Sequence, residues 1–293
     1  MDRTVLNALT VDVEDYFQVG AFASRIRPEE WDQWPSRVER NTDCLLALFD
    51  AHQVRATFFV LGWIAERYPD LVRRIRDQGH EVASHGYSHQ LVYNQSPETF
   101  RDEAARSKAL LEDILGEPVT GYRAASYSIT PKSRWALDIL VELGFTWDSS
   151  LFPIRHDVYG MPGTPVVPYR LETDNGGELV EFPLSTVNLL GQTLPIAGGG
   201  YFRLFPYWFS RWGLDSINRR QEPFIFYLHP WEIDPEQPRV DNISTKSRFR
   251  HYNNLARCYG RLERLLTKFR FGAVTDVLAE KDLTPANGTL TGK

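Results

Sequence analysis

Short apolar segments alternate with helical segments through most of the chain, and no other sequence feature constrains the fold as strongly. Apolar, β-branched and aromatic runs predict strands at residues 6–13, 54–62, 80–84 and 223–230. Helices are predicted at residues 36–53, 69–78, 97–115, 132–143 and 250–269. Ser96 and Thr130, each followed by proline, are predicted helix N-caps. Such alternation favours an α/β fold, in which helices cover a parallel sheet that is either open or closed into a barrel.

Residues 153–206 interrupt this pattern. The segment is rich in glycine and proline and contains the runs GGEL and IAGGGYF, which indicate loops and hairpins. We therefore expect one domain over residues 1–284, with residues 153–206 inserted over its body. A polar tail, residues 285–293, follows.

Charge and composition exclude several functional classes. The 33 basic and 38 acidic side chains give a net charge of −5, which argues against a general nucleic-acid binder. No apolar run is long enough for a transmembrane helix, and the first residues lack the apolar region of a signal peptide. Two cysteines, Cys44 and Cys258, do not form a disulfide framework. We expect a soluble, cytoplasmic protein.

The strongest local motif is His85-Gly-Tyr-Ser-His89, directly after a predicted strand. Residues four apart share a face if the turn coils helically, so the two imidazoles can converge on one ion. Imidazole is a favoured ligand of zinc and its neighbours in the first transition row. The alternative is a pair of unrelated surface histidines.

A second motif, Asp12-Val-Glu14-Asp15, ends the first predicted strand. Three carboxylates this close repel one another unless a cation or hydrogen-bond donors neutralise them. Strand alternation places Asp12 and Glu14 on one side and Asp15 on the other. Parallel α/β folds carry their sites at the carboxyl ends of strands, so this motif and the histidine pair are expected to meet. The alternative is a solvated acidic loop.

Three further residues fit such a site. His229 ends the late apolar strand and is a candidate general acid, with Asp148 a candidate to orient and charge its imidazole. Arg123 is a candidate to hold a catalytic carboxylate by a bidentate contact. Each of them is alternatively an ordinary strand-end or surface residue.

Taken in order, six motifs resemble the NodB-homology polysaccharide deacetylases, carbohydrate esterase family 4. They are TVDVEDYF, ATFFVLGW, HEVASHGYSH, GYRAASYS, WDSS and FYLHPWE. The run GGGYFR and the block beginning SRFRHYNN are similar to deacetylases encoded in exosortase and exopolysaccharide loci, so residues 245–280 resemble a C-terminal extension of that subgroup. The resemblance covers about Leu6 to Leu278.

This resemblance implies a distorted (β/α) barrel that binds one divalent metal, most often zinc. It implies His85 and His89 as metal ligands and Asp12 as the general base, held by Arg123. It further implies His229 as the acid, tuned by Asp148. The chain departs from the family pattern at Asp-Val-Glu-Asp, so that either Glu14 or Asp15 is the third ligand, and at Ala125, where the family usually has proline.

The implied reaction is hydrolysis of an N-acetyl group from an amino sugar of a glycan or its precursor. Because no signal peptide is found, we expect the reaction in the cytoplasm or at the inner membrane face. A backbone N–H near Ser126 would help to hold the oxyanion. Aromatic rings near the motifs are candidate sugar contacts, or alternatively core residues. The candidate substrate contacts are Ser126, Tyr127, Tyr201, Phe202 and Trp231, with Tyr16 and Phe17. The alternatives are hydrolysis of a small cyclic amide or a formamido sugar, and a non-catalytic glycan-binding module.

Overall fold

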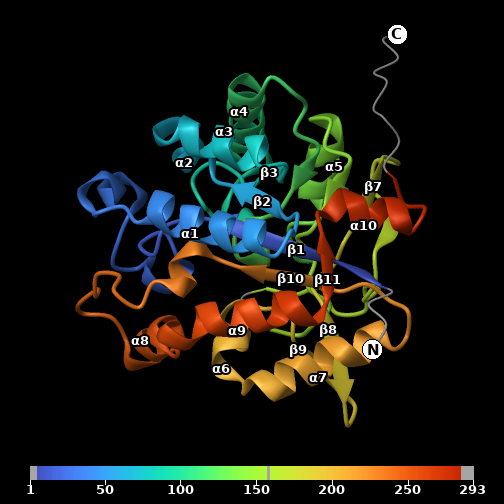
Figure 1. The fold of residues 1–293 in the computed structure, drawn as a ribbon. Coiled ribbons are helices and arrows are strands. Elements are labelled where there is room, and N and C mark those ends of the chain that lie inside the picture. The colour runs from blue at the N-terminus through green and yellow to red at the C-terminus, as the bar shows by residue number, and fades with distance from the viewer. Residues whose placement is uncertain (1–4, 157–158, 285–293) are drawn as a thin grey trace.

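A computed structural model describes residues 5–156 and 159–284, and its strands form one large sheet at the centre (Figure 1). The strands of this sheet are β1 (Leu6–Val13), β2 (Thr57–Val60), β3 (Glu81–Ser84), β4 (Gly121–Tyr122), β5 (Trp147–Asp148), β6 (Tyr169–Glu172), β7 (Glu178–Glu181), β10 (Ile225–Leu228) and β11 (Arg270–Gly272). Their order is β10-β1-β2-β3-β4-β5-β7-β6, and β11 pairs with the start of β1. All pairs are parallel except β6 with β7. The expected α/β fold with a parallel sheet is confirmed.

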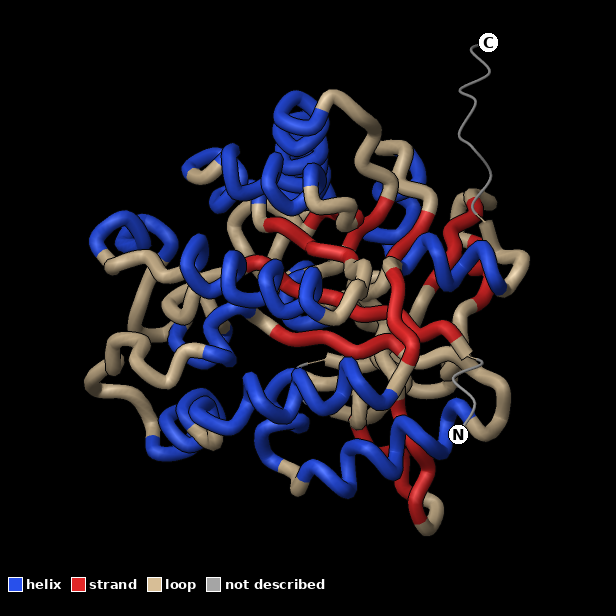
Figure 2. The backbone as a smooth tube through the Cα atoms, viewed as in Figure 1, coloured by secondary structure: helices blue, strands red, loops and turns tan. Residues whose placement is uncertain are grey.

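Helices surround the curved sheet and lie above and below it in the view of Figure 2. They are α1 (Val38–Ala51), α2 (Gly62–Arg67), α3 (Pro69–Asp77), α4 (Pro97–Leu115), α5 (Trp135–Glu142), α6 (Gly199–Leu204), α7 (Tyr207–Asn218), α8 (Thr245–Tyr252), α9 (Leu255–Lys268) and α10 (Val274–Glu280). Helices α2 to α5 lie along one side of the sheet in Figure 1, and α6 to α9 along the other. No helix in the described ranges is both long and apolar enough to cross a membrane.

Strand alternation divides the side chains of β1 between two packing layers. Leu9, Val11 and Val13 belong to the larger apolar cluster, whereas Leu6 and Ala8 belong to a smaller, separate one. Thr10 and Asp12 have the same parity as Leu6 and Ala8, so they point into the layer enclosed by the curved sheet. A polar residue in this layer meets the ends of neighbouring strands rather than the covering helices.

The glycine- and proline-rich insertion contributes to the sheet itself. It supplies β6 and β7, and β7 pairs with β5. It also contains the hairpin of β8 (Thr186–Leu189) and β9 (Gln192–Pro195). Residues 197–198 then run beside β10, where the Tyr227 N–H donates to the Ala197 carbonyl. The composition indicated the hairpins but not the strand in the main sheet.

Several predicted helix ends differ from the structure. The long helix predicted at 250–269 is two helices, broken where Asn254 adopts a left-handed conformation at φ 53°. Ser96 is an N-cap as expected, and its hydroxyl accepts from the Thr99 N–H. The predicted cap at Thr130 is wrong, because Thr130 lies in a turn before α5. The polar tail at 285–293 lies outside the described residues.

Candidate functional site

Four chemically active side chains lie at the carboxyl ends of four strands and point into the same layer. Asp12 comes from β1, His85 follows β3, Arg123 follows β4 and His229 follows β10. In each case the preceding residue packs on the opposite face of the sheet or bonds to a covering helix, as Ser84 does with Ser107 of α4. The parity of four strands therefore brings these residues together, as the sequence predicted.

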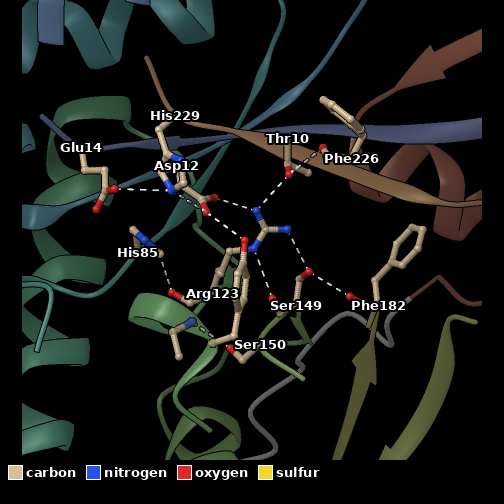
Figure 3. Close-up of polar contacts among 12 residues, drawn as sticks. Thr10, Asp12, Glu14, His85, Arg123, Ser149, Ser150, Phe182, Phe226 and His229 are labelled. Carbon is tan, nitrogen blue, oxygen red and sulfur yellow. Dashed lines mark hydrogen bonds and ion pairs between the residues drawn. The ribbon is translucent and has the colours of Figure 1, made fainter. Parts of the chain in front are cut away.

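Arg123 holds Asp12 within a fully buried network (Figure 3). Its Nη1 donates to Asp12 Oδ1 at 2.6 Å and to Thr10 Oγ1 at 2.9 Å, and its Nη2 donates to Ser149 Oγ at 2.9 Å. The expected bidentate contact is wrong, since one guanidinium nitrogen contacts the carboxylate and the others bond to Ser149. Asp12 Oδ2 remains directed toward the cleft, where the Tyr127 hydroxyl lies 3.4 Å away.

Glu14 meets the two motif histidines. Ligand atoms of Glu14, His85 and His89 all lie within 4.8 Å of one another. Glu14 Oε2 is 2.9 Å from His89 Nε2. His85 Nδ1 bonds to the Arg123 carbonyl at 2.8 Å, so its Nε2 is the ring nitrogen left for a ligand. This arrangement favours Glu14 as the carboxylate of a metal site.

The histidine motif converges by a turn rather than by a helix. Gly86 and His89 have positive φ values of 72° and 54°. The two imidazole centroids are 5.5 Å apart. The expected helical coiling is wrong, but the two imidazole rings still converge.

Asp15 points away from the histidines toward the start of α1. Its Oδ2 accepts from the Ser36 hydroxyl and from the backbone N–H groups of Arg37 and Val38. These bonds satisfy N–H groups that the first turn of a helix leaves without internal partners. Asp15 is thus a helix-capping residue in this geometry.

The ionisable side chains of the cluster have pKa values shifted in different directions. Burial by itself would raise the pKa of Glu14, but the nearby His89 and His229 outweigh it and hold that pKa at about 2. Burial lowers the pKa of His85 to about 4. Burial also opposes charge on His229, yet the adjacent Glu14 and Glu232 carboxylates raise its pKa to about 9. At neutral pH the cluster combines an ionised Glu14, a neutral His85 and a charged His229.

His229 faces Glu14 and Asp12 across the cleft (Figure 3). Its Nε2 is 3.4 Å from Glu14 Oε1 and 3.9 Å from Asp12 Oδ2. Its ring stacks on Trp231 at a centroid distance of 5.2 Å, and the Trp231 N–H donates to Glu14 Oε1. His229 is therefore placed to exchange a proton with a group bound between it and Asp12.

Asp148 is not the partner of His229. Its carboxylate accepts from the hydroxyl and N–H of Ser150, and in the strand register Asp148 lies opposite Glu181. The carboxylate beside His229 Nδ1 is that of Glu232, at 3.4 Å. The motif FYLHPWE contains Glu232, so its spacing of three residues from His229 was the available signal, but no role was predicted for it.

The open pocket over these residues has a partly aromatic wall. Besides Asp12, Glu14 and the histidines it is lined by Ser126, Tyr127, Tyr159, Tyr227 and Trp231. Ser126 and Tyr127 both have positive φ, 50° and 55°, a conformation that costs energy for residues other than glycine. Because two successive pocket residues have this unfavourable conformation, the surrounding structure must hold the backbone in it.

Some predicted aromatic contacts lie in the core instead. Tyr16, Phe17 and Phe202 are buried, with Phe17 against Trp31 and Phe202 against Phe226. Their prediction as sugar contacts is wrong, because the turn after β1 directs Tyr16 and Phe17 into the core and Phe202 lies on the buried side of α6. Tyr201 is half-buried behind the wall, and its hydroxyl bonds to that of Tyr159 at 2.9 Å.

Two family models match the chain side by side. Residues 30–146 match the polysaccharide deacetylase family, and residues 149–279 match a domain of unknown function, DUF3473. A peptidoglycan deacetylase of Helicobacter pylori is 29% identical over 152 residues, which are 52% of this chain and 51% of that protein. A chitooligosaccharide deacetylase of Bradyrhizobium is 30% identical over 99 residues, 34% of this chain and 43% of that one. Residues 30–146 are thus similar to the polysaccharide deacetylase family.

The alignments with these relatives cover only part of each protein. The chain spans about half the length of the peptidoglycan deacetylase it matches. Among solved structures, a Mycobacterium smegmatis protein assigned to the polysaccharide deacetylases aligns with a TM-score of 0.64 at 22% identity, covering 99% of this chain and 95% of that one. Puue allantoinase aligns with a TM-score of 0.60 at 14% identity, covering 96% and 91%. The barrel-type fold of the deacetylases is thus shared over nearly the whole chain.

The site combines residues of both matched regions with Asp12 and Glu14, which precede them. His85, His89 and Arg123 lie in the deacetylase region, whereas His229 and Glu232 lie in the DUF3473 region. Both regions contribute strands to the same sheet. The DUF3473 region is therefore part of the cleft rather than an appendage to it.

Proposed function

We propose that the protein is a metal-dependent hydrolase that removes N-acetyl groups from amino sugars of a polysaccharide or its precursor. The observation that carries this proposal is the placement of a two-histidine, one-carboxylate cluster between Asp12 and His229. The similarity to peptidoglycan and chitooligosaccharide deacetylases supports an acetylated saccharide as the substrate.

The residues present fit a divalent cation. Two imidazole nitrogens and one carboxylate oxygen within 4.8 Å are the donor set of hydrolytic zinc sites, which leave a position for water. We propose that Glu14, His85 and His89 hold one ion, which their donor chemistry identifies as zinc. When bound, such an ion would polarise the acetamide carbonyl and favour ionisation of a water.

Groups of the protein itself carry out the remaining steps. Asp12, oriented by Arg123, accepts the proton of the attacking water. The backbone N–H at Ser126 stabilises the developing oxyanion. His229 lies across the cleft from Asp12 and protonates the departing amine, because an unprotonated amine is a poor leaving group. The rings of Tyr127, Tyr159 and Trp231 contact the sugar.

We further propose that the protein belongs to the deacetylases of exosortase and exopolysaccharide loci and acts in the cytoplasm, at the inner membrane face. The DUF3473 match over the GGGYFR and SRFRHYNN segments supports this subgroup. Cys44 and Cys258 are free thiols, as in reducing compartments.

Acetate release from N-acetylated chitooligosaccharides, measured with and without a chelator, tests the function. We expect release that the chelator abolishes and added zinc restores. Asp12→Asn should keep bound zinc while losing about 10²–10⁴-fold in turnover. Formate release from a formamido sugar, or ring opening of a cyclic ureide, without acetate release from any acetylated saccharide, would contradict the proposal. Saccharide binding without hydrolysis would do so as well.

A further inference from the structure

His229, Glu232 and Arg203 form a buried chain of charges beside the cleft. Glu232 is fully buried and Arg203 is 2% exposed. Glu232 Oε1 lies 3.4 Å from His229 Nδ1 and 3.4 Å from Arg203 Nε. Within the described residues these are the two ion pairs that Glu232 makes. Because an unpaired carboxylate in the interior costs several kcal/mol, such a group persists only where its partners are held in place.

Arg203 is fixed by the break between α8 and α9. Its Nη1 donates to the carbonyls of His251 and Asn253, and its Nη2 donates to that of Arg250. These contacts engage both terminal nitrogens and leave Nε directed toward Glu232. Arg203 thus holds the carboxylate from the side opposite to His229.

Stacking fixes the plane of the His229 ring. Trp231 lies between His229 and His251, with centroid distances of 5.2 Å and 4.2 Å and interplanar angles of 19° and 15°. The His251 ring is held in turn by Gln237. Stacking restrains the tilt of the ring, and a contact at one ring nitrogen then determines which nitrogen faces the cleft.

We propose that Glu232, held by Arg203, is the positioning residue of His229. Its carboxylate pairs with the Nδ1–H side of the ring, at 3.4 Å, and thereby keeps Nε2 directed at the substrate. The inference rests on the proposed function for the acid role of His229. It assigns to the DUF3473 region the alignment of the proton donor, a role for which the sequence suggested Asp148.

The kinetic test compares two substrates of the zinc-loaded full chain, an N-acetylated chitooligosaccharide and 4-nitrophenyl acetate. A nitrophenolate leaves without a proton, so misalignment of the donor slows only the amide. We expect Glu232→Gln to lower kcat for the amide about 10–100-fold with little change in KM, and to leave the ester rate within about threefold. Glu81→Gln, at a half-buried glutamate that bonds to Thr57 at the opposite end of β3 from His85, is the control and should keep the wild-type ratio of rates.

Equal changes on both substrates in Glu232→Gln would overturn the inference, as would a changed ratio in Asp148→Asn but not in Glu232→Gln. His229→Ala separates this failure from that of the proposed function. If His229→Ala leaves the ratio unchanged, the acid role itself is wrong. If His229→Ala changes the ratio and Glu232→Gln does not, only the positioning role is wrong.

A spectroscopic test needs no substrate. A ring N–H bonded to a buried carboxylate is protected from exchange and resonates far downfield in proton NMR. We expect such a resonance in wild type and Glu81→Gln, assigned to His229 by its loss in His229→Ala. Glu232→Leu, which cannot accept the bond, should lose it. Its persistence unchanged in Glu232→Leu would refute the positioning role.

Discussion

Adjacent acidic side chains at Glu14 and Asp15 point in opposite directions as the chain leaves β1. Glu14 continues the inward parity of Asp12 and reaches His89, whereas Asp15 binds the first N–H groups of α1. Strand alternation predicted that the two side chains point to opposite sides. Which of them is the metal ligand could be decided only from the position of α1. That position depends on packing distant in sequence, which no local pattern contains.

This division predicts different losses for the two residues. Glu14→Gln should weaken zinc binding at least 10-fold, because an amide is a poor ligand for zinc, and should leave the fold intact. Asp15→Ala should retain zinc but lose about 1–3 kcal/mol of unfolding free energy, because one buried and two partly buried donors lose their acceptor. Calorimetric zinc titration and urea unfolding measure the two effects. The reverse pattern, zinc lost in Asp15→Ala and kept in Glu14→Gln, would show that Asp15 is the ligand.

At the scale of elements, the long apolar strands and the capped helix α4 were predictable from sequence. Strand β1 occupies residues 6–13 as expected, because eight consecutive positions are buried. Strands β4 and β5, with two residues each, carry no periodicity that a pattern can detect. The break at Asn254 was missed because the apolar spacing continues across it into α9. Arg203 binds carbonyls beside this break, so its place next to Glu232 was not predictable without the break.

Strands β5 and β7 place two interior carboxyl groups opposite each other, and this pairing predicts a pH dependence of stability. Burial and the nearby Asp148 raise the pKa of Glu181 well above its usual value, and burial raises the pKa of Asp148 to about 6. The folded chain therefore retains protons that the unfolded chain releases above about pH 4. By linkage, the stabilisation is complete below that pH and is lost as the pH rises toward 6 and beyond.

Replacing one member of the pair should reduce this loss. From pH 4.5 to pH 7.5, the unfolding free energy of wild type should fall relative to that of Glu181→Gln. The difference should be about 1 kcal/mol or more, since one pKa unit corresponds to 1.36 kcal/mol. Urea unfolding at the two pH values measures the change. Glu178→Gln, at the exposed end of the same strand, is the control and should follow wild type. Parallel behaviour of all three proteins would show that Glu181 is ionised in the folded state.

At the scale of the whole molecule, the two regions matched by family models form one sheet and one cleft. The motifs predicted that the site residues would meet, because each follows a strand. They did not predict that β7 of the insertion completes the sheet, since its sequence is short and flanked by glycine. A boundary between sequence families, near residue 148, is therefore not a boundary between folding units.

Because one sheet spans both regions, we predict that the deacetylase region does not fold alone. A fragment of residues 1–148 lacks β10 and β11, which cover β1, and β7, which covers β5. We expect no cooperative urea transition by circular dichroism for the fragment, and one cooperative transition for the full chain. A cooperative transition in the fragment would mean that the deacetylase region is an independent domain.

Strand β1 pairs on one side with β2, which follows it closely in the sequence, but its other partners, β10 and β11, are far along the chain. Val11 pairs with Leu228, and Leu6 with Arg270. At synthesis rates of about 5–20 residues per second, the first of these partners emerges roughly 10–40 s after β1. During that interval the nascent chain presents an apolar strand edge that neighbouring chains can pair with. Until β10 and β11 have been made, aggregation through that edge therefore competes with folding.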